Sequence, residues 1–141
     1  MKFTEPEMTK AVEAVARQLF AASRPPWRRG DQDQAWRELK AIERYNHLAA
    51  AGEVVLPVLV ALPERPTVGA TPEFTDEEYL AAAEGASRDL MEHRQPGVWE
   101  AMGERKRRKL NQGTAELARV AVEGMPIRQD PDAFNIPDYL D

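Results

Sequence analysis

Histidine and carboxylate side chains are the first candidates for catalysis or metal binding in this chain of 141 residues. The two histidines, His47 and His93, each lie near the end of an expected helix, without a glutamate or second histidine at the spacing of a zinc site. A helix C-terminus favours a positive charge, which accounts for both positions without catalysis. No glycine-rich phosphate loop is present, and the absence of cysteine excludes thiolate chemistry and disulfides. We therefore predict a protein that is not an enzyme and has no catalytic residue, metal site or cofactor.

A run of cations is the strongest charge feature of the sequence. The stretch ERKRRK, residues 104–109, contains Arg105, Lys106, Arg107, Arg108 and Lys109. Too few acidic residues lie nearby on the expected helix to pair all of these cations. Two interpretations stay open: a solvated helix face that docks the protein's own acidic tail, and a patch that binds nucleic acid. The formal net charge of −5 weighs against nucleic acid as the main partner.

The three tryptophans fall into two groups. Trp36 and Trp99 each lie on the apolar stripe of an expected helix, and we predict that both anchor the core. Trp27 instead stands between Pro26 and Arg28 in an expected loop. Loop aromatic residues beside arginines are common in protein interfaces, so we predict that Trp27 contacts a partner.

The C-terminal stretch DPDAFNIPDYLD combines acidic residues, prolines and apolar side chains without a helical or strand period. This composition is typical of a short linear motif that inserts apolar anchors into a groove of a partner. The expected anchors are Phe134, Ile136, Tyr139 and Leu140. The alternative is that the tail folds back on its own domain. FNIPDYLD also resembles the acidic tails with which the bacterial tubulin-like division GTPase and bacterial single-strand DNA-binding protein recruit partners, but it departs from them at Asp141.

Composition and length indicate one ordinary globular domain, with 43% hydrophobic and 30% charged residues. There is no run of 18 or more apolar residues, and the first residues lack the basic and then apolar plan of a secretory signal. We therefore expect a soluble cytoplasmic protein with no membrane partner. The composition leaves the oligomeric state open.

Two stretches with the same helix-start signature lie 71 positions apart: FTEPEM from Phe3 and FTDEEY from Phe74. In each stretch a threonine is followed three residues later by a glutamate, which predicts a capping box. The same shift aligns several identical residues further along the two expected helices, and a tryptophan opens a second helical stretch in each half. The pattern is consistent with a tandem duplication, and also with two independent helix starts.

Hydrophobic periodicity predicts four helices, at residues 5–22, 33–51, 76–94 and 98–123, with Gly113 as a point where the last one could break. Residues 53–73 contain β-branched valines and prolines, and Pro57 would interrupt a helix there. We predict an extended apolar connector, with a short strand or a strand-mediated dimer as the alternative.

The expected fold is all-α, with two helical hairpins in a four-helix arrangement. Residues 1–124 would form a single helical domain, with units 3–52 and 74–124 joined by the connector 53–73. Residues 125–141 would form an acidic, proline-rich tail.

The first unit contains AVEAVARQLF, then a variable loop, a tryptophan, and further on ERY and LA. This order resembles small uncharacterised helical accessory proteins of tailed bacteriophages, particularly those of actinobacteria. The resemblance covers the first unit and, more loosely, the second. It implies an accessory protein that acts in the cytoplasm of a bacterial host cell, with no catalytic residues to carry over.

Taken together, these features predict a non-enzymatic protein-binding module that binds or inhibits a host protein. One alternative is a small nucleic-acid-associated regulator that uses residues 104–109. Another is a structural or assembly component of a virion.

Overall fold

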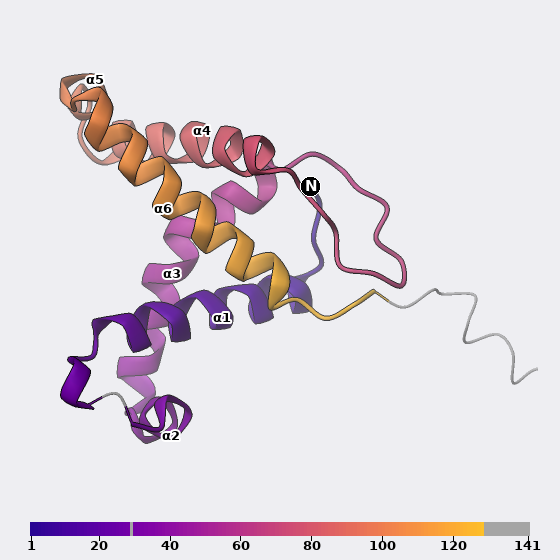
Figure 1. Cartoon of the computed structure of the whole chain (residues 1–141), viewed down its shortest axis with the longest axis vertical. Helices are drawn as coiled ribbons and strands as arrows, with labels where there is room; N and C mark the ends of the chain where they lie inside the picture. The colour runs from indigo at the N-terminus through magenta and orange to yellow at the C-terminus, as the bar shows by residue number, and fades with distance from the viewer. Residues whose placement is uncertain (29, 129–141) are drawn as a thin grey trace, which may run out of the picture.

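The computed structural model describes residues 1–28 and 30–128, and its regular structure is helical, as expected. The helices are α1 (Glu5–Ser23), the short 3-10 helix η1 (Pro26–Arg28), α2 (Gln32–Glu38), α3 (Ala41–Ala61), α4 (Asp76–Arg94), α5 (Val98–Ala101) and α6 (Glu104–Glu123), as Figure 1 shows. No strand forms in the described part of the chain, where one isolated parallel bridge joins Val68 to Arg128. None of the helices described combines the length and apolar character needed to cross a bilayer.

Both expected helix starts are capping boxes. The Thr4 hydroxyl accepts from the Glu7 amide at 3.3 Å, and the Glu7 carboxylate accepts from the Thr4 amide at 2.8 Å. Thr75 and Glu78 make the same two hydrogen bonds, at 3.1 and 2.9 Å. Each pair satisfies two of the amides that a helix start leaves without partners.

The predicted helix over residues 33–51 is two helices, α2 and α3. Leu39 and Lys40 between them have extended backbone. The Arg44 side chain donates to the carbonyls of Arg37 and Leu39 at 3.0 and 2.8 Å. Arg44 thus satisfies carbonyls that the end of α2 leaves free, which stabilises the break.

The predicted extended connector is wrong over residues 53–61, because α3 continues through Pro57 to Ala61. A proline inside a helix costs about 3 kcal/mol. Here Pro57 is exposed, so water can reach the carbonyl that loses its partner. Val55, Val58 and Leu59 on the opposite face are fully buried, and burial contributes about 1.5–3 kcal/mol for each such side chain. Burial therefore outweighs the proline, and only the part of the connector after Ala61 is non-helical.

The predicted helix over residues 98–123 is also divided, but at Met102 and Gly103 rather than at Gly113. Gly103 takes the extended backbone of a helix N-cap, so α6 begins anew at Glu104. Gly113 lies inside α6 on an exposed face, where the helix continues without interruption.

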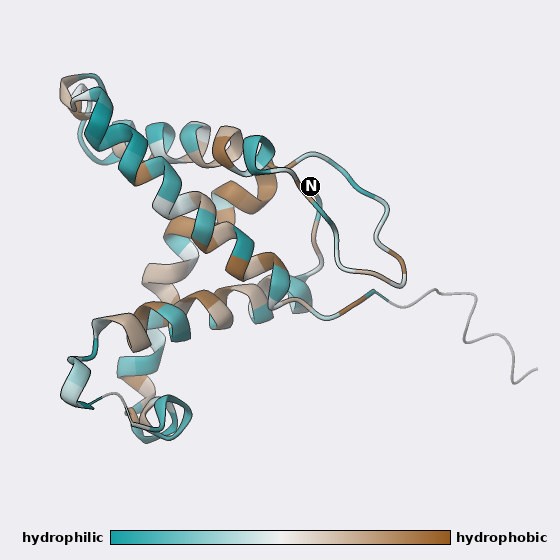
Figure 2. Cartoon of the chain, in the orientation of Figure 1, coloured by the Kyte–Doolittle hydropathy of each residue, from teal (hydrophilic) through white to brown (hydrophobic). Residues whose placement is uncertain are grey.

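Four long helices share one core. In Figure 1, α3 and α6 cross in the middle of the molecule, α1 packs against both at one end, and α4 packs against both at the other. Many buried positions are alanines, which let the helices approach closely. Among the glycines, Gly124 has the tightest surroundings, because an added Cβ would lie 2.6 Å from the Ala14 Cβ. Figure 2 shows α6 hydrophilic at its start and more hydrophobic toward its end, where this contact lies.

The two halves of the chain use equivalent positions to build this core. In α3 the buried residues are Ala51, Gly52, Val55, Val58 and Leu59. In α6 they are Thr114, Ala115, Ala118, Ala121 and Val122. The second set follows the first at a constant shift of 63 positions, the separation of Ala51 from Thr114. This agreement is what a repeated unit with a shorter loop in its second copy would produce, and the duplication itself stays a prediction.

Candidate functional site

Neither histidine belongs to a metal-binding cluster in the described residues. No group of three or more histidine, aspartate or glutamate side chains that could hold a metal ion occurs in the described residues. His93 lies in the last turn of α4, as expected. His47 was expected near a helix end, which is wrong because α3 extends well beyond it. Its ring packs against those of Phe20 and Trp36, with centroids 5.5 and 6.0 Å away.

The tryptophans differ in exposure. Trp36 and Trp99 are 7% and 5% exposed, so both are buried, and Trp36 belongs to the hydrophobic core cluster whereas Trp99 lies outside it. Trp27, in η1, is 82% exposed and therefore accessible to a partner. The four expected tail anchors lie outside the described residues. They are Phe134, Ile136, Tyr139 and Leu140.

The five consecutive cations do not form one patch. Because an α-helix has 3.6 residues per turn, neighbours in sequence point to different sides of α6. Arg107 lies over the Trp99 ring, 6.0 Å from its centroid, and Arg108 donates to Glu104 at 3.2 Å. Lys106 and Lys109 lie on another side of the helix. The sequence suggests a single basic surface, whereas the helix places Arg107 and Arg108 at one hollow and Lys106 and Lys109 at another. Arg105 lines neither hollow.

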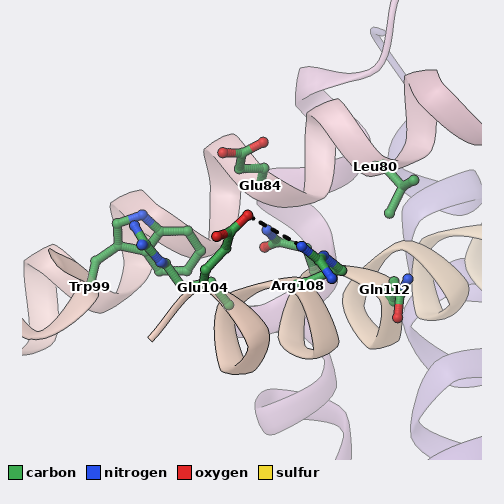
Figure 3. Close-up of a pocket in the computed structure, with 8 residues that line it drawn as sticks. Leu80, Glu84, Trp99, Glu104, Arg108 and Gln112 are labelled. Atoms are coloured by element: carbon green, nitrogen blue, oxygen red, sulfur yellow. Dashed lines mark hydrogen bonds and ion pairs between the residues drawn. The ribbon is translucent and has the colours of Figure 1, made fainter. Parts of the chain in front are cut away.

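The first hollow, of about 550 Å³, lies between α4, α5 and α6. Figure 3 shows Glu84 on α4 above the Glu104–Arg108 pair, with Trp99 at one end and Leu80 and Gln112 at the other. Two glutamates, Glu84 and Glu104, and two arginines, Arg107 and Arg108, line this hollow. Such a balance gives no net attraction for an anion.

The second hollow is an apolar groove of about 570 Å³ between α1, α3 and α6, which we call the α1–α3–α6 groove. It is lined by Leu19, Val54, Lys106, Lys109, Leu110, Gly113, Thr114 and Leu117. Leu19 and Leu110 are 39% and 38% exposed. The charged residues that line the groove are Lys106 and Lys109. Neither side chain makes a hydrogen bond or an ion pair within residues 1–28 and 30–128.

The groove was not found from sequence. Leu19, Leu110 and Leu117 fall inside the helices predicted over residues 5–22 and 98–123, and Val54 falls inside the predicted extended connector. One signal was present: Lys106, Leu110, Gly113 and Leu117 recur at the spacing of one helix face. A stripe that contains both a lysine and a glycine is poorly suited to a sealed core, and it indicates a face left partly open.

Comparison of the chain with protein-family models, curated proteins and solved structures finds no match.

Proposed function

We propose that this protein is a non-enzymatic protein-binding module whose α1–α3–α6 groove binds an acidic peptide segment with apolar side chains. The observation that carries the proposal is the combination of exposed leucines and exclusively positive charge around the groove. Burying Leu19 and Leu110 under apolar side chains of a partner would contribute favourable free energy in proportion to the area covered. Lys106 and Lys109 would attract acidic residues that flank those side chains.

The proposed partner is a host protein in a bacterial cell, and the chain is an accessory factor of a tailed bacteriophage. The resemblance of the first unit to such accessory proteins supports this part of the proposal. Trp27 adds a second contact on the α1–α2 connection, because its exposed ring would bury a large apolar area in an interface.

A selection from displayed peptides tests the proposal. The purified full-length chain would be used to select from a library of peptides that covers the proteome of an actinobacterial host. We expect enriched peptides to share acidic and apolar residues, and to be lost when the bait carries Leu110→Glu. Leu80→Glu is the matched control, since Leu80 is 37% exposed and lines the other hollow. Equal enrichment on both variants would contradict the proposal.

The nucleic-acid alternative is supported by one observation, the absence of ion pairs to Arg105, Lys106 and Lys109 in the described part of the chain. It predicts that the protein binds a labelled DNA duplex with an affinity that falls steeply as salt increases. Binding of this kind, together with no enrichment of peptides, would favour the regulator over the protein-binding module.

A further inference from the structure

The segment after Arg128 has the chemistry that the groove requires. Residues 129–141, QDPDAFNIPDYLD, contain four aspartates and no lysine or arginine. Between the aspartates lie two aromatic and two aliphatic side chains, at Phe134, Ile136, Tyr139 and Leu140. The inference rests on the proposed function of the groove and concerns how that function is regulated. We infer that residues 129–141 occupy the α1–α3–α6 groove of their own chain and compete there with partner segments.

The last described residues after α6 run away from the groove (Figure 1), so the segment has to turn back after Arg128 to reach it. Arg128 is held beside the first turn of α1 by hydrogen bonds to Glu7, at 2.9 and 3.0 Å. From Gly124, which lies against Ala14, α1 and α6 diverge in the direction of the groove (Figure 1). A segment that turns back after Arg128 would therefore run antiparallel to α6. Its apolar residues would meet Leu117 and Leu110, and its last aspartates would meet Lys109 and Lys106.

The length of the segment is sufficient. Along the axis of α6, Leu117 and Lys106 lie about 9 and 26 Å from Glu123. Residues 124–128 add at most about 17 Å to these distances. An extended chain covers about 20 Å from Arg128 to Phe134 and about 41 Å from Arg128 to Leu140. If residues 124–128 led straight away from the groove, Leu117 would lie about 26 Å from Arg128, which is beyond the reach of Phe134. Ile136, at about 27 Å of extended chain, and the later Tyr139 and Leu140 would still reach it.

A spin label on the full-length chain tests the inference. The sequence has no cysteine, so Asn135→Cys provides a single attachment point for a nitroxide. We expect strong paramagnetic broadening of the methyl NMR signals of Leu110 and Leu117, and much weaker broadening of Leu80. With Lys106→Glu and Lys109→Glu together, the broadening should decrease. It should persist with Arg105→Glu, a charge reversal on the same helix outside the groove.

Two results would overturn the inference. One is no selective broadening of the groove leucines. The other comes from a mixture of isotope-labelled chains without a nitroxide and nitroxide-labelled chains without isotopes. Broadening of the groove leucines in that mixture would place the segment of a second copy in the groove.

The competition is measured separately. If the segment fills the groove in about nine chains of ten, Phe134→Ser with Ile136→Ser should increase the affinity for a selected peptide about tenfold. Peptide binding that is unchanged by this pair, with no broadening, would refute the inference and leave the proposed function intact. Strong broadening with no binding of any selected peptide would support occupancy of the groove by residues 129–141 and refute the proposed function.

Discussion

Arg128 donates from Nε and Nη2 to the two carboxylate oxygens of Glu7, across almost the whole sequence. Glu7 is at the same time the acceptor of the α1 capping box. Arg65 donates from Nη2 to Glu78, the acceptor of the α4 capping box, while its Nε donates to the Glu73 carbonyl at 3.2 Å. The two arginines are separated by the same 63 positions as the equivalent core residues of α3 and α6. Each half of the chain thus sends an arginine to the helix start of the other half.

We expect Arg128→Ala to lower the free energy of unfolding by about 2 kcal/mol, because it leaves a buried carboxylate without its cation. Chemical denaturation of the full-length chain measures this change. Arg65→Ala is the matched control: Glu78 is more exposed, so the expected loss is below about 1 kcal/mol. An equal loss of unfolding free energy in the two variants would contradict a larger contribution of the Arg128–Glu7 pair.

Glu7 should also make stability depend on pH. Burial acts to raise its pKa, but the hydrogen bonds from Arg128 and Thr4 outweigh burial and hold the pKa below its ordinary value of 4.5. A carboxylate with a lowered pKa in the folded state stabilises the protein above its unfolded pKa, and this contribution is lost as pH falls through the folded pKa. We therefore expect the free energy of unfolding to decrease below about pH 4.5. Glu7→Gln should show a shallower decrease over the same range, and an identical decrease would rule out Glu7 as its source.

Two glycines of the C-terminal half should respond in opposite directions to alanine. At Gly124 a new Cβ would lie 2.6 Å from the Ala14 Cβ, so Gly124→Ala should cost about 1–3 kcal/mol. At Gly113 no neighbouring atom lies within 4 Å of a new Cβ, and alanine in a helix interior should stabilise by about 1 kcal/mol. Thermal unfolding of the two variants checks this. If Gly124→Ala were neutral, the close contact between α1 and the end of α6 would be refuted.

Pro57→Ala should stabilise the protein by about 1–3 kcal/mol, because it restores an amide donor for the Glu53 carbonyl inside α3. Pro57 is exposed, so little packing is lost. Denaturant unfolding gives the change. A loss of stability would instead show that the proline holds α3 in a bend that the core requires.

Much of the fold can be predicted from the sequence, because the strongest secondary-structure signals are local. The Thr4 and Thr75 capping boxes mark two helix starts, and the bounds of α4 agree with those predicted. The errors arise where tertiary packing overrides a local preference. Pro57 indicates a helix end, but the burial of its neighbours keeps α3 helical, and the break after α2 depends on Arg44, whose contacts no periodicity reveals.

The candidate site was predicted less well than the fold. Exposure of Trp27 followed from its neighbours in the loop. The placement of Arg107 and Arg108 at one hollow and of Lys106 and Lys109 at another depends on which helices flank α6, which the sequence does not specify. The groove depends further on Val54 of α3 and Leu19 of α1 meeting α6 at one point.

The most direct test of the groove is the affinity of one selected peptide for two matched pairs of variants, measured by fluorescence anisotropy. We expect Leu110→Glu and Lys109→Glu each to weaken binding about tenfold or more, as removal of a central contact does. Leu80→Glu and Arg105→Glu should stay within about twofold of the unmodified chain, because surface changes outside an interface cost little. Equal affinities within each pair would show that the peptide binds elsewhere and that the α1–α3–α6 groove is not the binding site.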